Sequence, residues 1–390
     1  MKLAIFLSII LSLLFGMHYA FFRSILCFFN ISNPYFRFFI NTLMVLLTFS
    51  FIFAFFWLHL HGNGWSVWFY RFSGVWMGFL IHFLTAVTLI WGIIGIAKLT
   101  GFPIHRQFFA AVILFAAAGY SVFGVWSSFH PIVRQISVPI KHLPENWEGR
   151  TIIQLSDVHL GHIYGKSFAD RLVNQVNSLH PDLILITGDL FDGVDGPYET
   201  FIDSINRFDS KQGVFFVTGN HEHYAGIKKV LKILEKARLR VLDNEMVDVD
   251  GLQILGVSYP GISRIEDIRN LKKNEGAETT RILMFHTPTN LLKNSGDRAK
   301  RHVSTYWKPD TSFDLNKTLH VDLQLSGHTH HGQIFPFNFV TQWLFKGYDY
   351  GLKRDGDFQI YTTCGTGSWG PPMRSPTRPE IVLIRLFAEE

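Results

Sequence analysis

Acidic residues are missing from the first third of this 390-residue chain, because no Asp or Glu precedes Glu145 while eight Lys and Arg do. All 31 acidic side chains lie in the remaining residues, which are slightly acidic overall. The formal net charge of +5 therefore arises in the first third and does not indicate a nucleic-acid-binding surface. We expect no nucleic-acid partner.

Cysteine is also scarce, since only Cys27 and Cys364 occur and they lie far apart in the sequence. Two such cysteines exclude a disulfide framework and a zinc site built from thiolates. Charged residues make up 17% of the chain, against about 25% in an average soluble domain. The chain is therefore neither one uniform soluble domain nor a disordered polymer.

Long apolar runs fill the first third, and each is long enough to cross a bilayer core as a helix. We predict spans at 3–22, 38–60, 74–97 and 108–129. No Asp, Glu, Lys or Arg lies at the centre of a run, which favours an anchor over a transporter. A cleaved signal peptide is the alternative interpretation of the first run. The predicted domains are a transmembrane region (1–130), a connector with a first strand (131–150) and a folded domain (151–390).

From Thr151 onward, short β-branched runs alternate with helical periodicity, which predicts an α/β domain. A polar group follows each of five predicted strands, at the strand end where α/β sheets bind ligands. These groups are Asp157 and His159, Asp189, Asn220 and His221, His286, and His328 and His330. Nitrogen and oxygen ligands without thiolate favour a pair of Mn, Fe or Zn ions.

The motifs D-x-H, GD, GNHE, a lone His after a strand, and GHTH occur in this order. Over residues 151–387 the chain thereby resembles the calcineurin-like metallophosphoesterase superfamily. After the four predicted spans, the resemblance implies an αββα domain, with layered mixed sheets flanked by helices. It implies a first metal on Asp157, His159 and His330, a bridging Asp189, and a second metal on Asn220, His286 and His328. His221 would be the catalytic proton donor to the leaving group.

The phrases LSDVHLG, LSGHTHHGQ and GTGSWGPPMR are similar to those of a membrane-anchored branch of this superfamily. The branch implies two divalent cations, with Mn expected to serve in vitro, and attack on phosphorus by metal-activated hydroxide. We expect cleavage of a phosphodiester or pyrophosphate on a membrane lipid such as UDP-2,3-diacylglucosamine. The alternatives are a broad-specificity phosphodiesterase or phosphomonoesterase acting on small phosphoesters, and a non-catalytic membrane scaffold.

Basic residues are divided evenly between the two sides of the predicted spans, and the N-terminal amine and Arg150 favour a cytoplasmic C-terminal domain. We expect a multi-pass protein with the lipid bilayer as its partner, and the resemblance suggests a bacterial inner membrane. The sequence leaves the oligomeric state open.

Three further segments suggest substrate contacts. The glycine-rich loop at Gly365 and Gly367 would present backbone N–H groups to an anion, and Arg374 would clamp a phosphate. The aromatic run 335–345 would either pack in the core or form an apolar lip towards lipid. The basic stretch 293–308 would be a solvated loop or a contact to anionic lipid.

Overall fold

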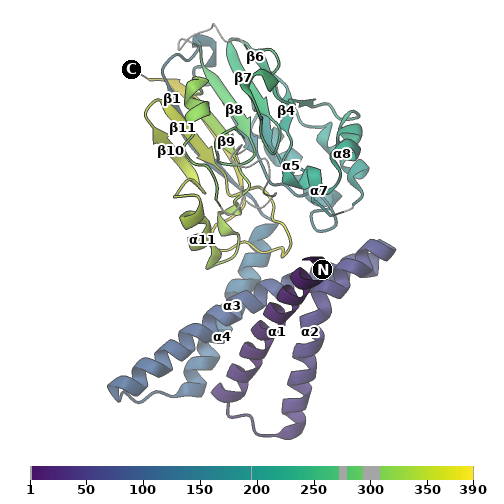
Figure 1. The fold of residues 1–390 in the computed structure, drawn as a ribbon, viewed down its shortest axis with the longest axis vertical. Coiled ribbons are helices and arrows are strands. Elements are labelled where there is room, and N and C mark those ends of the chain that lie inside the picture. The colour runs from purple at the N-terminus through teal and green to yellow at the C-terminus, as the bar shows by residue number, and fades with distance from the viewer. Residues whose placement is uncertain (1, 195, 272–278, 293–307, 390) are drawn as a thin grey trace. The chain divides into compact units, whose positions relative to one another are not determined.

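The computed structural model describes residues 2–194, 196–271, 279–292 and 308–389. By internal contacts these residues divide into two compact units. The first unit contains residues 1–127 together with two short segments from later in the chain, Ile334–Pro336 and Gly370–Ser375. The second unit contains the rest (Figure 1). Most of the basic stretch 293–308 lies outside the described residues.

Four long helices build the first unit, and all four are long and apolar enough to cross a membrane. They are α1 (Lys2–Phe28), α2 (Pro34–His61), α3 (Gly64–Thr100) and α4 (Arg106–Ser128). Each helix is longer than the corresponding predicted span. Helix α4 begins two residues before its predicted span and ends one residue before the end of that span. With 37 residues, α3 is about 55 Å long, which exceeds a bilayer core of about 30 Å.

The helix ends follow from local chemistry. Asn33 and Asn63 cap α2 and α3, because each side-chain oxygen accepts backbone N–H groups of the first turn. Gly62 and Gly101 end the same helices in the left-handed conformation. Large apolar side chains such as Phe53 and Phe115 point outward and are 58% and 82% exposed, as expected for helices that face lipid.

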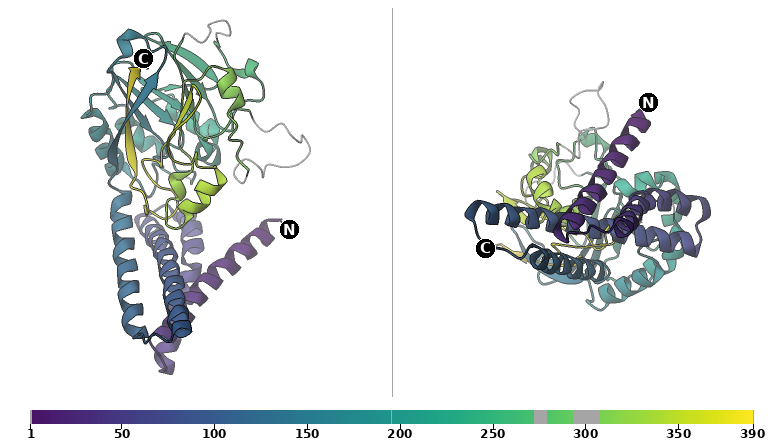
Figure 2. Two further views of the ribbon diagram at one scale, coloured as in Figure 1. Left: turned by 90° about the vertical axis from the view of Figure 1, so that its left-hand side faces the viewer. Right: turned by 90° about the horizontal axis from the view of Figure 1, so that it is seen from below.

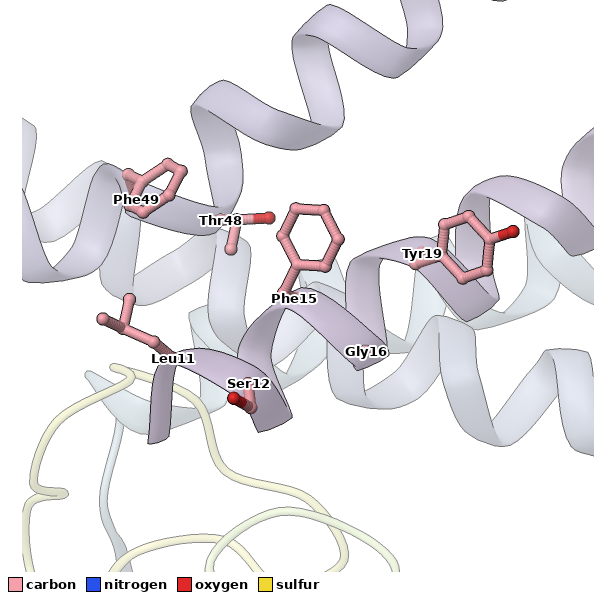
Figure 3. A pocket seen from close by; sticks show the side chains of 7 residues that line it. All are labelled: Leu11, Ser12, Phe15, Gly16, Tyr19, Thr48 and Phe49. Atoms are coloured by element: carbon pink, nitrogen blue, oxygen red, sulfur yellow. The ribbon is translucent and has the colours of Figure 1, made fainter. Parts of the chain in front are cut away.

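A pocket of about 520 Å³ lies between α1 and α2 (Figure 3). Its lining is largely apolar and consists of Leu11, Ser12, Phe15, Gly16, Tyr19, Thr48 and Phe49. Phe15, Tyr19 and Phe49 are about half exposed, so the pocket opens on the outer surface of the helices.

Two six-stranded sheets form the second unit, and Figures 1 and 2 show their strands stacked in layers. The first sheet has the order β1-β12-β2-β3-β4-β5. Its strands are β1 (Ile132–Ile140), β12 (Glu380–Ala388), β2 (Thr151–Leu155), β3 (Leu183–Thr187), β4 (Val214–Val217) and β5 (Arg240–Val241). Strands β2 to β5 are parallel, whereas β12 pairs antiparallel with β2.

The second sheet has the order β10-β11-β9-β8-β7-β6. Its strands are β10 (Gly351–Asp355), β11 (Phe358–Thr362), β9 (Leu323–Ser326), β8 (Arg281–Phe285), β7 (Leu252–Val257) and β6 (Glu245–Val249). The four central strands are parallel, and both edge strands are antiparallel to their neighbours. Side chains from both sheets, among them Ile152, Leu185, Ile254 and Leu325, share one buried core.

Short helices complete the second unit: α5 (Lys166–Asn177), α6 (Ile202–Ile205), α7 (Asn220–Tyr224), α8 (Ile227–Leu234), α10 (Asp314–Thr318) and α11 (Phe337–Leu344). The 3-10 turns are η1 (Glu145–Trp147), η2 (Tyr198–Phe201), η3 (Ile265–Asp267) and η4 (His330–Gly332). A second core packs α10 residues such as Leu315 against strands of the second sheet. The expected αββα fold after four long apolar helices is therefore confirmed, and part of the aromatic run 335–345 forms the helix α11.

Candidate metal centre

The predicted metal ligands come from the carboxyl ends of β2, β3, β4, β8 and β9. Parallel strands end at a common edge of their sheet, so segments distant in sequence meet there. Five of the seven predicted ligands have a positive φ between 50° and 73°: Asp157, His159, Asp189, His328 and His330. Non-glycine residues seldom adopt this strained conformation, and those that do concentrate at functional sites.

The first ligand cluster consists of Asp157, His159 and His330, all of them buried. His330 Nε2 lies 3.2 Å from Asp157 Oδ1 and 3.1 Å from His159 Nε2. Two imidazole nitrogens and a carboxylate oxygen thus converge on one point, as in a three-ligand metal site. Among the described residues His159 Nδ1 has no hydrogen-bond partner, so its ring is held by packing against His221 and His330.

The second cluster consists of Asp189, His286 and His328, joined by the amide of Asn220. Asn220 Oδ1 lies 3.1 Å from His286 Nε2 and 2.8 Å from His328 Nδ1. His286 Nδ1 lies 2.9 Å from the Thr187 carbonyl and donates to it, so in the neutral ring the lone pair of Nε2 is directed into the cluster.

Asp189 lies between the two clusters. Its Oδ2 is 3.2 Å from His286 Nε2 and 4.0 Å from His159 Nε2, and its Oδ1 accepts the backbone N–H of His221 at 2.9 Å. This is the position that a bridging carboxylate needs in a dinuclear centre. The structure thus brings all seven predicted ligands together, and their nitrogen and oxygen donors fit a pair of divalent cations.

The electrostatics of the cluster agree with a cation site. Burial would raise the pKa of Asp157, but the imidazoles of His330, His286 and His159 outweigh it and hold this pKa well below its usual range. Burial would lower the pKa of His286, yet the carboxylate of Asp189 raises it to about 9. Without metal, protonated imidazole thus balances the buried carboxylates, and bound cations would take over that role.

His221 sits beside the ligands and its side chain is 13% exposed. Its Nδ1 accepts the Gly193 N–H at 2.9 Å and lies 3.5 Å from Asp192 Oδ1, while its Nε2 lies 4.0 Å from Asp189 Oδ2. In the neutral ring the proton is therefore on Nε2, the nitrogen that faces the centre. Burial would lower the pKa of His221, but the neighbouring carboxylates, Asp192 first, raise it.

Two residues that support the metal centre were not predicted from the sequence. Glu222 is fully buried and accepts the backbone N–H groups of Asp189, Phe191 and Gly219; burial raises its pKa to about 7. Asp349 is 2% exposed and its carboxylate lies 2.7 Å from His331 Nδ1. The final letter of GNHE was a signal for Glu222, whereas no motif marks Asp349.

The predicted substrate contacts have other partners in the structure. Gly365 N–H donates to Thr363 Oγ1 and Gly367 N–H donates to the Asp157 carbonyl. A Cβ on Gly367 would meet the Val158 carbonyl at 2.2 Å, so this glycine serves close packing beneath the metal centre. Arg374 is buried within the helical unit, where its backbone N–H donates to the Gly124 carbonyl. Its phosphate contact stays a prediction.

Two largely buried clusters of nitrogen and oxygen donors that share one carboxylate, beside the imidazole of His221, have the composition of a dinuclear metallohydrolase centre. Comparison with known proteins agrees, since the family model for the calcineurin-like phosphoesterases matches residues 150–332. An uncharacterized metallophosphoesterase of Campylobacter jejuni is 33% identical over 277 residues, which cover 68% of this chain and 67% of the relative. The chain therefore belongs to the calcineurin-like metallophosphoesterase family, whose domain carries a dinuclear divalent metal centre for hydrolysis of phosphoesters.

Relatives with membrane helices also match. A Danio rerio transmembrane protein with a metallophosphoesterase domain is 30% identical over 299 residues, covering 72% of this chain and 63% of the relative. A Helicobacter pylori metallophosphoesterase is 35% identical over 242 residues, covering 60% and 59%. The matched region thus spans between 59% and 67% of these relatives. A solved dimetal phosphatase of Danio rerio covers 62% of this chain and 93% of its own, at 12% identity and a TM-score of 0.35.

Proposed function

We propose that this protein is a membrane-anchored, metal-dependent hydrolase of phosphodiesters or pyrophosphates carried by membrane lipids. The observation that carries the proposal is the complete dinuclear ligand set, with His221 beside it, in a chain with four apolar helices. Anchoring in a bilayer raises the local concentration of a lipid-linked substrate. UDP-2,3-diacylglucosamine is the first candidate substrate, on the strength of the sequence resemblance.

The chemistry divides between the cations and the protein. When bound, two divalent cations lower the pKa of water and neutralise phosphate charge. Asp189 spans the two clusters and fixes their separation, while Asn220 contributes a neutral oxygen to the second cluster. His221 Nε2 delivers a proton to the leaving oxygen, and its ring is oriented by the bonds of Nδ1 to Gly193 and Asp192.

The proposed cations are Mn, Fe or Zn, and we choose Mn²⁺ for assays because carboxylate, amide and imidazole donors all suit it. We place the protein in a bacterial inner membrane with the catalytic domain in the cytoplasm. The bacterial relatives support the membrane, and the N-terminal amine and Arg150 support the orientation.

The test is hydrolysis by the detergent-purified full chain with Mn²⁺. Substrates are bis-p-nitrophenyl phosphate, p-nitrophenyl phosphate and UDP-2,3-diacylglucosamine. We expect Asn220→Ala and His221→Ala to lower the rate by about 100-fold or more, and the exposed His142→Ala to leave it unchanged. Metal content should fall in Asn220→Ala and persist in His221→Ala.

The outcomes separate the alternatives. Much faster cleavage of the lipid pyrophosphate supports the proposed substrate class. Cleavage of the small esters alone would replace it with a broad-specificity phosphoesterase. Bound metal without cleavage of any substrate would contradict the hydrolase proposal and favour a membrane scaffold.

A further inference from the structure

Helix α11 presents an unusual outer face. Phe337, Phe339, Val340 and Trp343 are 47%, 59%, 44% and 77% exposed, and the helix contains no charged residue. Large apolar side chains gathered on one short helix of a folded domain mark a contact with another apolar phase. An exposed Trp is typical of segments at a membrane–water interface.

The inner face of α11 packs beside the metal centre. Thr341 Oγ1 donates to Asp349 Oδ2 at 3.1 Å, and the same carboxylate oxygen lies 2.7 Å from His331 Nδ1. Phe345, directly after the helix, is 1% exposed, and its ring centroid lies 6.5 Å from that of the predicted ligand His328. Hence α11 lies against the loop that carries two of the metal ligands.

The chain immediately before α11 belongs to the helical unit. Ile334–Pro336 and Gly370–Ser375 are the two short segments of that unit, and Phe335 N–H donates to Ser375 Oγ at 3.4 Å. Ser375 Oγ also lies 2.7 Å from Nε2 of His82 in α3.

This segment is held near the end of a span. The Arg374 backbone N–H donates to the Gly124 carbonyl at 2.9 Å, and Gly124 lies four residues before the end of α4. At 1.5 Å per residue this is about 6 Å from the helix end. Phe337, the first residue of α11, directly follows Pro336 of the helical unit in the chain.

Trp369 is a second exposed aromatic residue that lies near the metal centre and directly adjoins, in the chain, a segment of the helical unit. It is 50% exposed, its ring centroid lies 6.3 Å from that of His221, and the next residue, Gly370, belongs to the helical unit. Two hydrogen bonds join its backbone to the side chain of Gln333, three residues before Pro336. An exposed aromatic side chain therefore lies close to the catalytic imidazole.

We infer that the outer face of α11, with Trp369, contacts the lipid bilayer interface and admits phosphoester groups of bilayer lipids to the metal centre. The admission of lipid phosphoesters to the metal centre rests on the proposed function and deepens it. The contact with the bilayer can be measured without any enzyme activity. The occupant is a lipid surface because the residues just before α11 and just after Trp369 belong to the helical unit, whose four helices are long and apolar enough to cross a membrane. A partner protein on this face would not explain why both of these neighbouring segments belong to the helical unit.

The first experiment measures the contact in the full chain reconstituted into phosphatidylglycerol–phosphatidylcholine vesicles. A fluorophore is attached through Trp343→Cys, or through the exposed Lys353→Cys on β10 as the matched control, in a Cys27→Ser background; Cys364 is buried. Lipids spin-labelled near the headgroup should quench the fluorophore at position 343 several-fold more than at position 353. Equal quenching at both positions would overturn the inference.

The second experiment uses the double variant Phe339→Ser/Trp343→Ser. We expect hydrolysis of a lipid phosphoester in vesicles to fall about tenfold or more, while hydrolysis of soluble bis-p-nitrophenyl phosphate stays within about twofold of the parent. Equal losses on both substrates would contradict an entry role for α11. Strong quenching at position 343 without lipid hydrolysis would refute the proposed function and leave the bilayer contact standing.

Discussion

Gly327 gives the sharpest test of the metal centre, because a single methyl group added there would strike the first ligand. A Cβ on Gly327 would lie 2.1 Å from both Asp157 Oδ2 and Ser156 Oγ, whereas real Cβ atoms essentially never come closer than 3.0 Å to such atoms. The φ of Gly327 is not positive, so alanine adds no backbone strain of its own. The perturbation of Gly327→Ala is therefore a local clash with the predicted ligand Asp157 and with its neighbour Ser156.

The size of the effect follows from the overlap. Asp157 must withdraw by about 1 Å, and a misplacement of that size costs about 100-fold in rate. Asp157 also accepts the His328 backbone N–H at 3.0 Å, so its movement disturbs the loop that carries His328 and His330. We expect Gly327→Ala to lose metal from the first cluster and to reduce turnover of bis-p-nitrophenyl phosphate about 100-fold.

The assay combines metal content after dialysis, turnover with Mn²⁺ and thermal unfolding of the full chain in detergent. Gly347→Ala is the matched control, because φ is +83° there and nothing lies within 4 Å of its added Cβ. The control should lose about 1 kcal/mol of stability through backbone strain and keep both metals and its activity. Parental metal content and turnover in Gly327→Ala would refute the reasoning.

Three further predictions test the surroundings of the centre. Asp192→Asn should lower the pKa of His221, which the Asp192 carboxylate raises. Because a general acid must be protonated, the alkaline limb of the pH–rate profile should then move to lower pH. An unmoved limb would exclude His221 as the acid. Asp182→Asn should cost about 1–2 kcal/mol at neutral pH, because Asp182 accepts from Thr151 N–H and Lys211, which lower its pKa despite burial. That stability is present above the unfolded pKa of about 3.9 and disappears as pH falls through the lowered folded pKa, so thermal melts of variant and parent should converge in acid. Glu380→Gln should lower the melting temperature by an amount equivalent to about 1–3 kcal/mol, because its buried carboxylate accepts from Arg134, Tyr361 and Thr363; a shift no larger than that of the exposed Glu199→Gln would contradict this.

The residues that form the two clusters were predictable from the sequence because each follows closely on a buried strand. Parallel strands end at one edge, so Asp157, Asp189 and Asn220 had to gather once the strand pattern was recognised. Five of the ligands have positive φ, and this strain could not be predicted, because it is imposed by the packing around them.

Residues that support the ligands were harder to predict than the ligands themselves. Asp349 follows no motif, and its role depends on contacts with Thr341 and His331 that only the folded chain creates. For the glycine-rich loop, the sequence suggested a binding role where the structure shows a packing role. Its sequence suggested free N–H groups for an anion, but Gly367 donates to the Asp157 carbonyl and is needed for close packing.

By itself the sequence determined the four apolar helices, the α/β domain and the ordered polar residues that form the two clusters, because these depend on local hydrophobicity, strand pattern and motif order. The tertiary structure decided that Ile334–Pro336 and Gly370–Ser375 join the helical unit and that α11 exposes its aromatic face. Both depend on hydrogen bonds between residues far apart in the chain, such as His82 with Ser375. No local pattern encodes such contacts, since their partners meet only when the whole chain is folded.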